Sequence, residues 1–164
     1  MILRNAFQKY ASPTSFIRET WPKLKKLPQG KRLFSALVGK FIPYTGSISP
    51  FVEEVDNGMA VVIMVDRSSV RNHLNCIHAI ALANLGEFTT GLSVISQLAP
   101  GAKAILVRLE IDYFMKARGQ LTATAFSQIS NNIHADTDVA VAADIKNHAG
   151  DVVARASATW RIRP

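Results

Sequence analysis

The fold is decided by one stretch of the chain, residues 77–98, which reads IHAIALANLGEFTTGLSVISQL. Drawn as a helix, this stretch is apolar nearly all round, and the main interruptions are His78, Asn84, Glu87 and Gln97. A helix of this kind must be buried on most of its sides. At ~1.5 Å per residue it would extend over about 33 Å. We therefore expect one long helix that is enclosed by the rest of the domain.

Alternating apolar and polar residues predict strands on both sides of this helix. Before it, Met59, Val61, Ile63 and Val65 alternate with residues of the opposite face, and the turn Asn57-Gly58 predicts a hairpin with a strand near residues 50–56. After it, alternating runs cover residues 107–113, 121–125, 139–145 and 152–161. Successive strands with short links predict an antiparallel meander of four strands.

The order of two strands, one helix and four strands indicates an α+β domain. Neither the helix nor the sheet can bury its apolar face alone, so we expect a long curved antiparallel sheet wrapped around the central helix. This domain would occupy residues 46–164. Residues 1–45 are predicted to be a basic helical extension at the N-terminus, with helices near residues 13–21 and 30–40.

Positive charge is concentrated in this extension. Residues 1–42 contain nine Lys or Arg and one acidic residue, Glu19, whereas the remaining residues contain ten basic and eleven acidic side chains. Three interpretations of the basic helices stay open: a solvated face of helices packed on the domain, a contact with a lipid surface, or part of a phosphate-binding patch. No reading motif for nucleic acid occurs, and aromatic residues are not interleaved with the basic run, so we expect no nucleic-acid partner.

The composition favours a single domain without metal or cofactor. With 164 residues the chain fits one domain of ordinary size. Its one cysteine, Cys76, excludes an internal disulfide and is most simply a small buried residue. His73, His134 and His148 lack the spacing of metal ligands. The single cysteine, the missing signal peptide and the lack of an uninterrupted apolar span predict a cytoplasmic protein.

Three polar residues in or beside the long helix are candidates for function: Asn72, His78 and Glu87. An ionised carboxylate in an apolar helix is costly unless it is paired or lies at a wet cleft. Taken alone, Glu87 could belong to a solvent-facing stripe or to a structural ion pair. Nine residues correspond to half a turn net, so His78 and Glu87 point to opposite sides of the helix and cannot form a dyad within one chain.

Residues 72–87 read NHLNCIHAIALANLGE and resemble the central-helix signature of the hotdog-fold thioesterases, especially the phenylacetate-degradation type. That signature has an Asn, a His six residues later, and an acid nine residues after the His. Asn72, His78-Ala79 and Leu85-Gly86-Glu87 match these three positions, and the strand order matches the same fold over roughly residues 45–163. Two departures are Ala79-Ile80, where the family usually has Gly after the His, and Glu87, where close relatives often have Asp.

The resemblance implies an acyl-CoA thioesterase that acts as a homodimer or a dimer of dimers. Glu87 would be the general base or the nucleophile, and Asn72 of the facing subunit would orient the water or the carbonyl. The start of the helix at His78 and Ala79 would bind the thioester carbonyl, with His78 also capping the helix. The phosphates of CoA would bind the basic extension or one of four arginines, Arg67, Arg71, Arg108 and Arg118.

The replacement of glycine by Ala79-Ile80 supports an alternative, a hotdog module that binds acyl-CoA or another acyl ligand without catalysis. A membrane contact through the basic extension stays open beside both interpretations.

Overall fold

The structure, a computed structural model, describes residues 13–130 and 133–164. The first twelve residues of the predicted basic extension therefore lie outside the described residues. The chain begins with a helical hairpin of α2 (Pro13–Leu24) and α3 (Gly30–Phe41), followed by the single turn α4 (Pro43–Gly46). The remaining elements, in chain order, are β1 (Phe51–Asp56), β2 (Met59–Met64), the 3₁₀ turn η1 (Ser68–Val70), α5 (Ala79–Gln97), β3 (Lys103–Tyr113), β4 (Leu121–Phe126), β5 (Thr137–Lys146) and β6 (Val152–Arg163).

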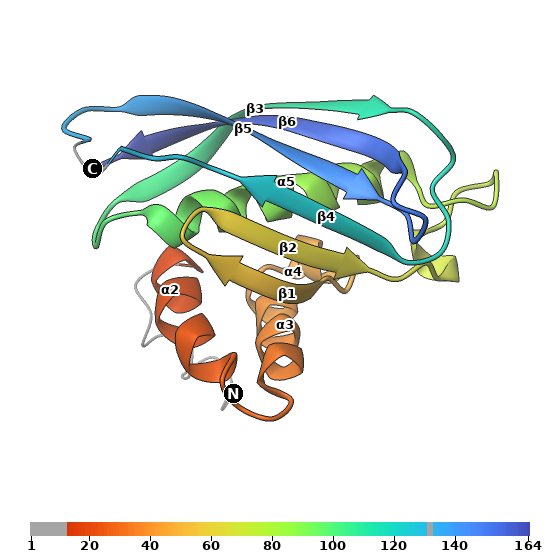
Figure 1. Ribbon diagram of the computed structural model, residues 1–164, viewed down its shortest axis with the longest axis horizontal. Helices are drawn as coiled ribbons and strands as arrows, with labels where there is room; N and C mark the ends of the chain where they lie inside the picture. Colours follow the sequence, from red (N-terminus) through yellow and green to blue (C-terminus); the bar gives the residue numbers. More distant parts are fainter. Residues whose placement is uncertain (1–12, 131–132) are drawn as a thin grey trace.

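The strands form one antiparallel sheet in the order β1-β2-β4-β5-β6-β3, and the sheet curves around α5 (Figure 1). The predicted architecture of a curved sheet around a central helix is confirmed, as is the β1–β2 hairpin. Its turn uses Asn57 and Gly58, both with positive φ. This backbone conformation is favourable for Asn and Gly and matches the twist of the paired strands.

The predicted meander of four strands is wrong in one respect. Only β4, β5 and β6 follow one another in the sheet, whereas β3 pairs with β6 at the far edge. Strand β4 pairs with β2 from Met59↔Phe126 to Met64↔Leu121 and with β5 on its other side, so it has no free edge for β3. Alternation along a strand reports a buried face, and it does not report which strand lies beside it.

Two helix boundaries differ from those expected. Helix α5 begins at Ala79 because His78 is its N-cap, and the preceding Ile77 is held in a bridge with Arg71. Helix α2 continues to Leu24 past Pro22. Pro22 lies in the last turn, so the missing N–H removes a helical hydrogen bond only where the helix is about to end.

Helix α5 lies in the core of the domain. Among its buried residues Leu85, Leu92 and Val94 are at most 1% exposed, and they pack with apolar side chains of the strands. Within the described residues α5 is the one helix long and apolar enough to cross a membrane, and 67% of that window is buried inside the domain. Most of this helix is therefore packed against the rest of the domain.

Small residues let α5 approach the sheet closely. A Cβ atom added at Gly86 would lie 2.3 Å from the Cβ of Ala156 on β6. One turn further on, a Cβ at Gly91 would lie 3.0 Å from the ring of Trp160. The indole Nε1 of Trp160 donates a hydrogen bond of 3.2 Å to the Thr90 hydroxyl. These contacts set both the distance and the rotation of α5 against β6.

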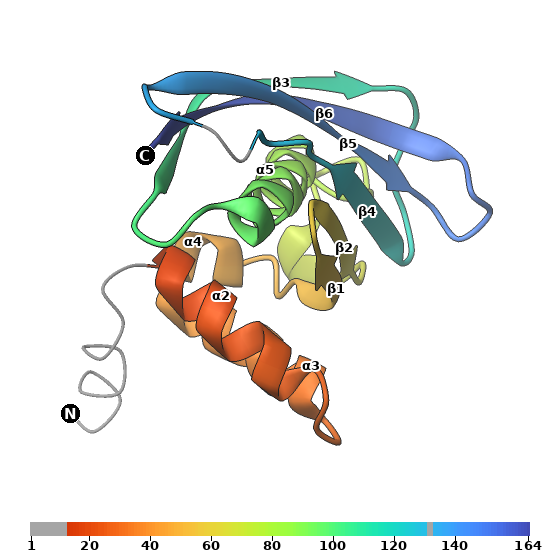
Figure 2. The same cartoon turned by 60° about the vertical axis from the view of Figure 1, so that its left-hand side comes forward.

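The helical hairpin covers the β1 edge of the sheet (Figure 2). The indole of Trp21 donates to the Val55 carbonyl at 2.7 Å, and the Ser35 hydroxyl accepts from the Val52 N–H at 2.9 Å. Buried residues of α2 and α3, including Phe34, belong to the same apolar cluster as those of α5 and the sheet. The domain boundary expected at residue 45 stays a prediction.

The contact between Gly86 and Ala156 can be tested by moving one methyl group. We expect Gly86→Ala to lower the free energy of unfolding by about 1–3 kcal/mol, because the added methyl has no space. In the background of Ala156→Gly the same change should cost less, and urea unfolding of the four proteins of this cycle measures the coupling. A Gly86→Ala variant as stable as the parent protein would show that the helix can shift away from the sheet.

Candidate active site

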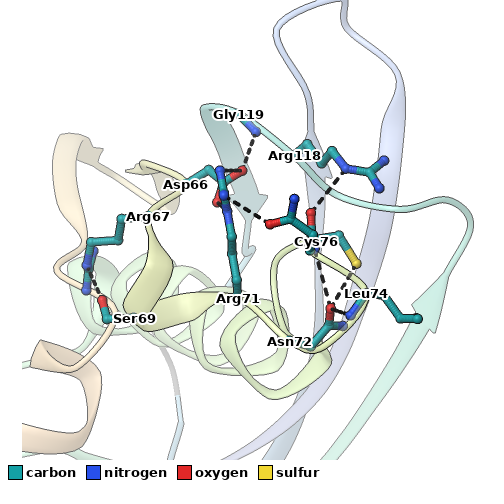
Figure 3. Close-up of polar contacts among 10 residues, drawn as sticks. Asp66, Arg67, Ser69, Arg71, Asn72, Leu74, Cys76, Arg118 and Gly119 are labelled. Carbon is teal, nitrogen blue, oxygen red and sulfur yellow. Dashed lines mark hydrogen bonds and ion pairs between the residues drawn. The ribbon is translucent and has the colours of Figure 1, made fainter.

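The loop between β2 and α5 is fixed by a network of polar contacts (Figure 3). The Asp66 carboxylate pairs with the Arg71 guanidinium at 2.7 Å and accepts a hydrogen bond of 3.0 Å from the Gly119 N–H. The hydrogen bond from Arg71 holds the pKa of Asp66 below its usual value. A further bond of 3.3 Å joins the Arg118 Nε to the Asn75 carbonyl. The loop is therefore tied to the segment that enters β4.

Asn72 uses its side-chain oxygen to shape this loop. Its Oδ1 accepts from the backbone N–H of Leu74 at 3.0 Å and of Cys76 at 3.4 Å, and it lies 3.3 Å from the Cys76 sulfur. Side-chain oxygens of Asn commonly stabilise turns in this way. The Nδ2 group makes no hydrogen bond to any other part of residues 13–130 and 133–164. The amide NH₂ of Asn72 is thus available to a ligand, and its oxygen is not.

The start of α5 leaves one backbone N–H without a partner. His78 acts as the N-cap, since its Nδ1 accepts from the Ile80 N–H at 3.0 Å, and its carbonyl accepts from Ala81 and Leu82. Its own N–H donates to the Val70 carbonyl at 2.8 Å. Of the first-turn donors, the Ala79 N–H alone has no acceptor within the described part of the chain. A helix N-terminus with a free N–H favours negative charge on a bound group.

The expectation that His78 caps the helix is confirmed. Because Nδ1 accepts a hydrogen bond, the ring carries its proton on Nε2 when it is neutral. The ring lies at a pocket of about 180 Å³ that is also lined by Tyr44, Ile80 and Asn84. This pocket is separate from the one that contains Asn72 and Ala79.

Asn72 and Ala79 line a common pocket of about 320 Å³. Its other walls are largely apolar and come from the loop before α5, α5 itself, the end of β3 and the segment that follows β3. They are Cys76, Ile77, Leu82, Tyr113, Phe114, Met115, Lys116 and Ala117. The Tyr113 hydroxyl donates to the Ala79 carbonyl at 3.0 Å, and burial raises the pKa of Tyr113. The structure therefore brings together two of the four predicted site residues beside an apolar surface.

Glu87 lies elsewhere on the same helix. It is eight residues beyond Ala79, which places it about 12 Å further along the axis and about 80° around it. It is about 40° around the helix from Gly91, which contacts Trp160, and so it lies toward the β6 side of the helix, where β3 is the next strand and the edge of the sheet. One chain therefore does not bring Glu87 to the pocket of Asn72.

The Glu87 carboxylate is half-buried and has no hydrogen bond or ion pair with any described residue. The proposed structural ion pair is therefore absent from the described part of the chain. Desolvation raises the pKa of Glu87 above its ordinary value. An unpartnered, partly buried carboxylate on a core helix is costly for stability, and groups whose pKa is shifted by their surroundings are concentrated at functional sites.

All four arginines considered for phosphate binding already have at least one partner. Arg67 donates to the carbonyls of Ser47 and Ile48, Arg71 pairs with Asp66, and Arg108 pairs with Glu110 at 2.6 Å. Arg118 uses only its Nε. Lys116, which sequence reasoning did not single out, lines the pocket and has no partner within the described residues. In the sequence, the one signal for Lys116 is that it directly follows two apolar residues, Phe114 and Met115.

The described residues contain no cluster of metal-ligating side chains. Within residues 13–130 and 133–164 no three His, Cys, Asp or Glu side chains come together. The candidate site is thus built from one amide NH₂ group, one free backbone N–H, a carboxylate at a distance and an apolar wall.

Comparisons with known structures place this geometry in a wider group. A crystal structure from structural genomics is 29% identical and superposes with a TM-score of 0.77, covering 90% of this chain and 97% of that chain. A thioesterase from Staphylococcus aureus is 18% identical, with a TM-score of 0.66 and coverage of 74% and 99%. A phenylacetic acid degradation-related protein from Ralstonia eutropha is 20% identical, with a TM-score of 0.63 and coverage of 73% and 89%. These similarities establish the hotdog fold.

A search of curated proteins found no match. The family model described as a domain of unknown function, DUF4442, matches residues 30–162, from the start of α3 to the end of β6. The match covers the hairpin helix α3, the candidate pocket and Glu87 alike. The chain is therefore a hotdog-fold member of the DUF4442 family.

Proposed function

We propose that this protein is a thioester hydrolase that acts on acyl-CoA, with its active site formed between two subunits. The observation that carries the proposal is a pair of unused polar groups on α5, the half-buried Glu87 carboxylate and the Ala79 N–H. Several solved structures of other proteins with this fold are named as thioesterases. The apolar pocket beside Ala79 supports an acyl substrate.

Two subunits are required because Glu87 and the pocket lie apart in one chain. The β1 edge of the sheet is covered by the helical hairpin, whereas the eleven-residue strand β3 ends the sheet on the other side. A long uncovered edge strand is a template for pairing with another chain. Glu87 faces this side of the helix, so pairing of β3 with β3 of a second copy would bring Glu87 toward the pocket of the partner subunit.

In the proposed reaction the thioester carbonyl oxygen accepts a hydrogen bond from the Ala79 N–H. Glu87 of the facing subunit takes a proton from a water molecule, and the hydroxide adds to the carbonyl carbon. The oxyanion that forms is stabilised by the Ala79 N–H and the positive end of the helix dipole. Collapse of the tetrahedral intermediate breaks the C–S bond, and the CoA thiolate receives the proton from Glu87. The amide NH₂ of Asn72 orients the water or the carbonyl.

Direct attack by Glu87 on the carbonyl carbon is the other route, and it would form an acyl anhydride that water then hydrolyses. Repeated turnover in ¹⁸O-labelled water tests this route, because attack of water on the Glu87 carbonyl carbon of the anhydride leaves label in the Glu87 carboxylate, whereas the general-base route leaves none there. Lys116, which lines the pocket, and Arg118, two residues further along the chain, have free donors for the phosphates of CoA.

A non-catalytic module that binds an acyl ligand is the second candidate. It is favoured by Ala79, which lines the pocket and has a methyl group where the glycine of the family signature has only a hydrogen atom. Tight binding of acyl-CoA without release of thiol would support this candidate.

The first test is release of free thiol from a panel of short, medium, long and aromatic acyl-CoAs. We expect turnover by the parent protein and a loss of about 10²–10⁴-fold in kcat for Glu87→Gln, which keeps the shape of the side chain and removes the base. Glu19→Gln removes one carboxylate from the exposed face of α2 and should leave the rate unchanged. Turnover that survives in Glu87→Gln would mean that the base lies elsewhere.

The raised pKa of Glu87 predicts the shape of the pH–rate profile. A general base must be deprotonated, so kcat/KM should rise with pH through a midpoint above the ordinary Glu value of about 4.3. Steady-state rates at constant ionic strength between pH 4 and 8 measure this limb. A midpoint at or below the ordinary value would contradict the assignment of Glu87 as a desolvated base.

The same pKa predicts a pH-dependent gain in stability for Glu87→Gln. A carboxyl group whose pKa is raised by folding stabilises the folded state below its unfolded pKa, and this contribution is lost as pH rises through the folded pKa. The Gln variant should therefore have a higher Tm than the parent protein at pH 8, and the difference should vanish near pH 4. Thermal unfolding at both pH values measures it, and an equal or lower Tm at pH 8 would indicate an ion partner for Glu87.

A further inference from the structure

The tip of the α2–α3 hairpin is the part of this fold that the proposed reaction does not use. We define the hairpin tip as residues 23–33, from the last turn of α2 to the first turn of α3. Figures 1 and 2 both show it at the end of the hairpin that points away from the sheet. The candidate pocket lies on other elements, η1 to α5 and the end of β3.

Cations on the hairpin tip are divided into two sets. Lys25 and Lys31 point toward β1 and pair with Glu54 at 3.1 Å and with Glu53 at 2.6 Å. Three others, Lys23, Lys26 and Arg32, are exposed and have no ion pair or hydrogen bond with the described residues. Glu53 and Glu54 of β1 are thus engaged by the inner cations, and the outer cations have no such acidic partner among the described residues.

Two leucines are exposed among these outer cations. Leu27 is 56% exposed and Leu33 is 52% exposed, whereas the neighbouring Phe34 is fully buried. Neither a solvated cationic face nor phosphate contacts with nucleic acid would involve exposed leucine side chains. Apolar side chains flanked by Lys and Arg are the composition of surfaces that bind at the headgroup level of a bilayer.

The backbone of the hairpin tip is held in one conformation. The Leu27 N–H donates to the Leu24 carbonyl and the Gly30 N–H to the Leu27 carbonyl, both at 2.9 Å. A Cβ at Gly30 would lie 1.7 Å from the Leu24 carbonyl oxygen, so the chain turns as tightly as glycine allows. This turn fixes Leu27 and Leu33 on the outside, and binding would therefore require little ordering of the chain.

From these observations we infer that the hairpin tip binds the surface of an anionic lipid bilayer. Lys23, Lys26 and Arg32 contact the charged headgroups, and Leu27 and Leu33 insert between them. The inference is independent of Glu87 and of the proposed reaction. Binding through the hairpin tip would hold the protein at a membrane surface, into which amphiphilic acyl compounds partition.

The test is co-sedimentation of the full chain with vesicles of phosphatidylcholine that contain 30 mol% phosphatidylglycerol, compared with vesicles of phosphatidylcholine alone. We expect binding to the anionic vesicles at 50 mM salt and its loss as the salt concentration rises. The triple variant Lys23→Gln, Lys26→Gln, Arg32→Gln should bind on the order of 100-fold more weakly. The double variant Leu27→Ser, Leu33→Ser should bind roughly tenfold more weakly.

Matched controls remove the same groups from other surfaces. Lys40→Gln, Lys103→Gln, Lys146→Gln causes the same loss of charge at exposed positions away from the hairpin tip, and Phe126→Ser removes an apolar side chain that is 66% exposed on β4. Both controls should bind within twofold of the parent protein, and thermal unfolding confirms that every variant is folded.

Three outcomes would overturn the inference. The first is no binding of the parent protein to anionic vesicles at 50 mM salt. The second is equal weakening by the hairpin-tip variants and the controls, because net charge alone would then explain binding. The third is a lipid affinity that does not change in the leucine variant while binding of a DNA duplex falls in the cation variant, which would assign the surface to nucleic acid.

Discussion

Helix α5 and strand β6 approach each other at Gly86 so closely that no side chain fits between them. The Cβ of Ala156 occupies the space in which a side chain at position 86 would lie. The indole of Trp160 sets the rotation of the helix one turn later, through its contact with Gly91 and its hydrogen bond to Thr90. The distance of α5 from β6 and the direction of Glu87 follow from these contacts. A chemical group adjacent to so close a contact has little freedom to move.

Sequence reasoning predicted the elements and the central helix because their signals are local. Alternation identifies a strand, and an apolar circumference identifies a buried helix, whatever lies around them. The neighbour of β3 was missed because strand pairing depends on which edge is vacant after the other strands have paired. The extension of α2 past Pro22 was missed because Pro22 lies in the last turn, where its missing N–H removes a hydrogen bond just before the helix ends.

The candidate site was predictable in its residues and not in their arrangement. Spacing predicts that His78 and Glu87 diverge, and the structure adds that the His78 ring and the Ala79 N–H belong to different pockets. Which arginines are available could not be predicted, because the partners of Arg67 and Arg71 come from the backbone and from Asp66. Likewise, the division of cations on the α2–α3 hairpin depends on Glu53 and Glu54, which lie on β1.

The two ends of the sheet differ in a way that affects assembly. The β1 edge is closed by a hydrogen bond from Trp21 of α2 and one to Ser35 of α3, and the β3 edge is open. If two copies joined through β3, the continuous sheet would have a helical hairpin at each end and no open edge. Such a sheet cannot grow by further addition of strands, so the geometry that permits a dimer also prevents a filament. The helical hairpin would thus protect the protein against aggregation as well as complete its core.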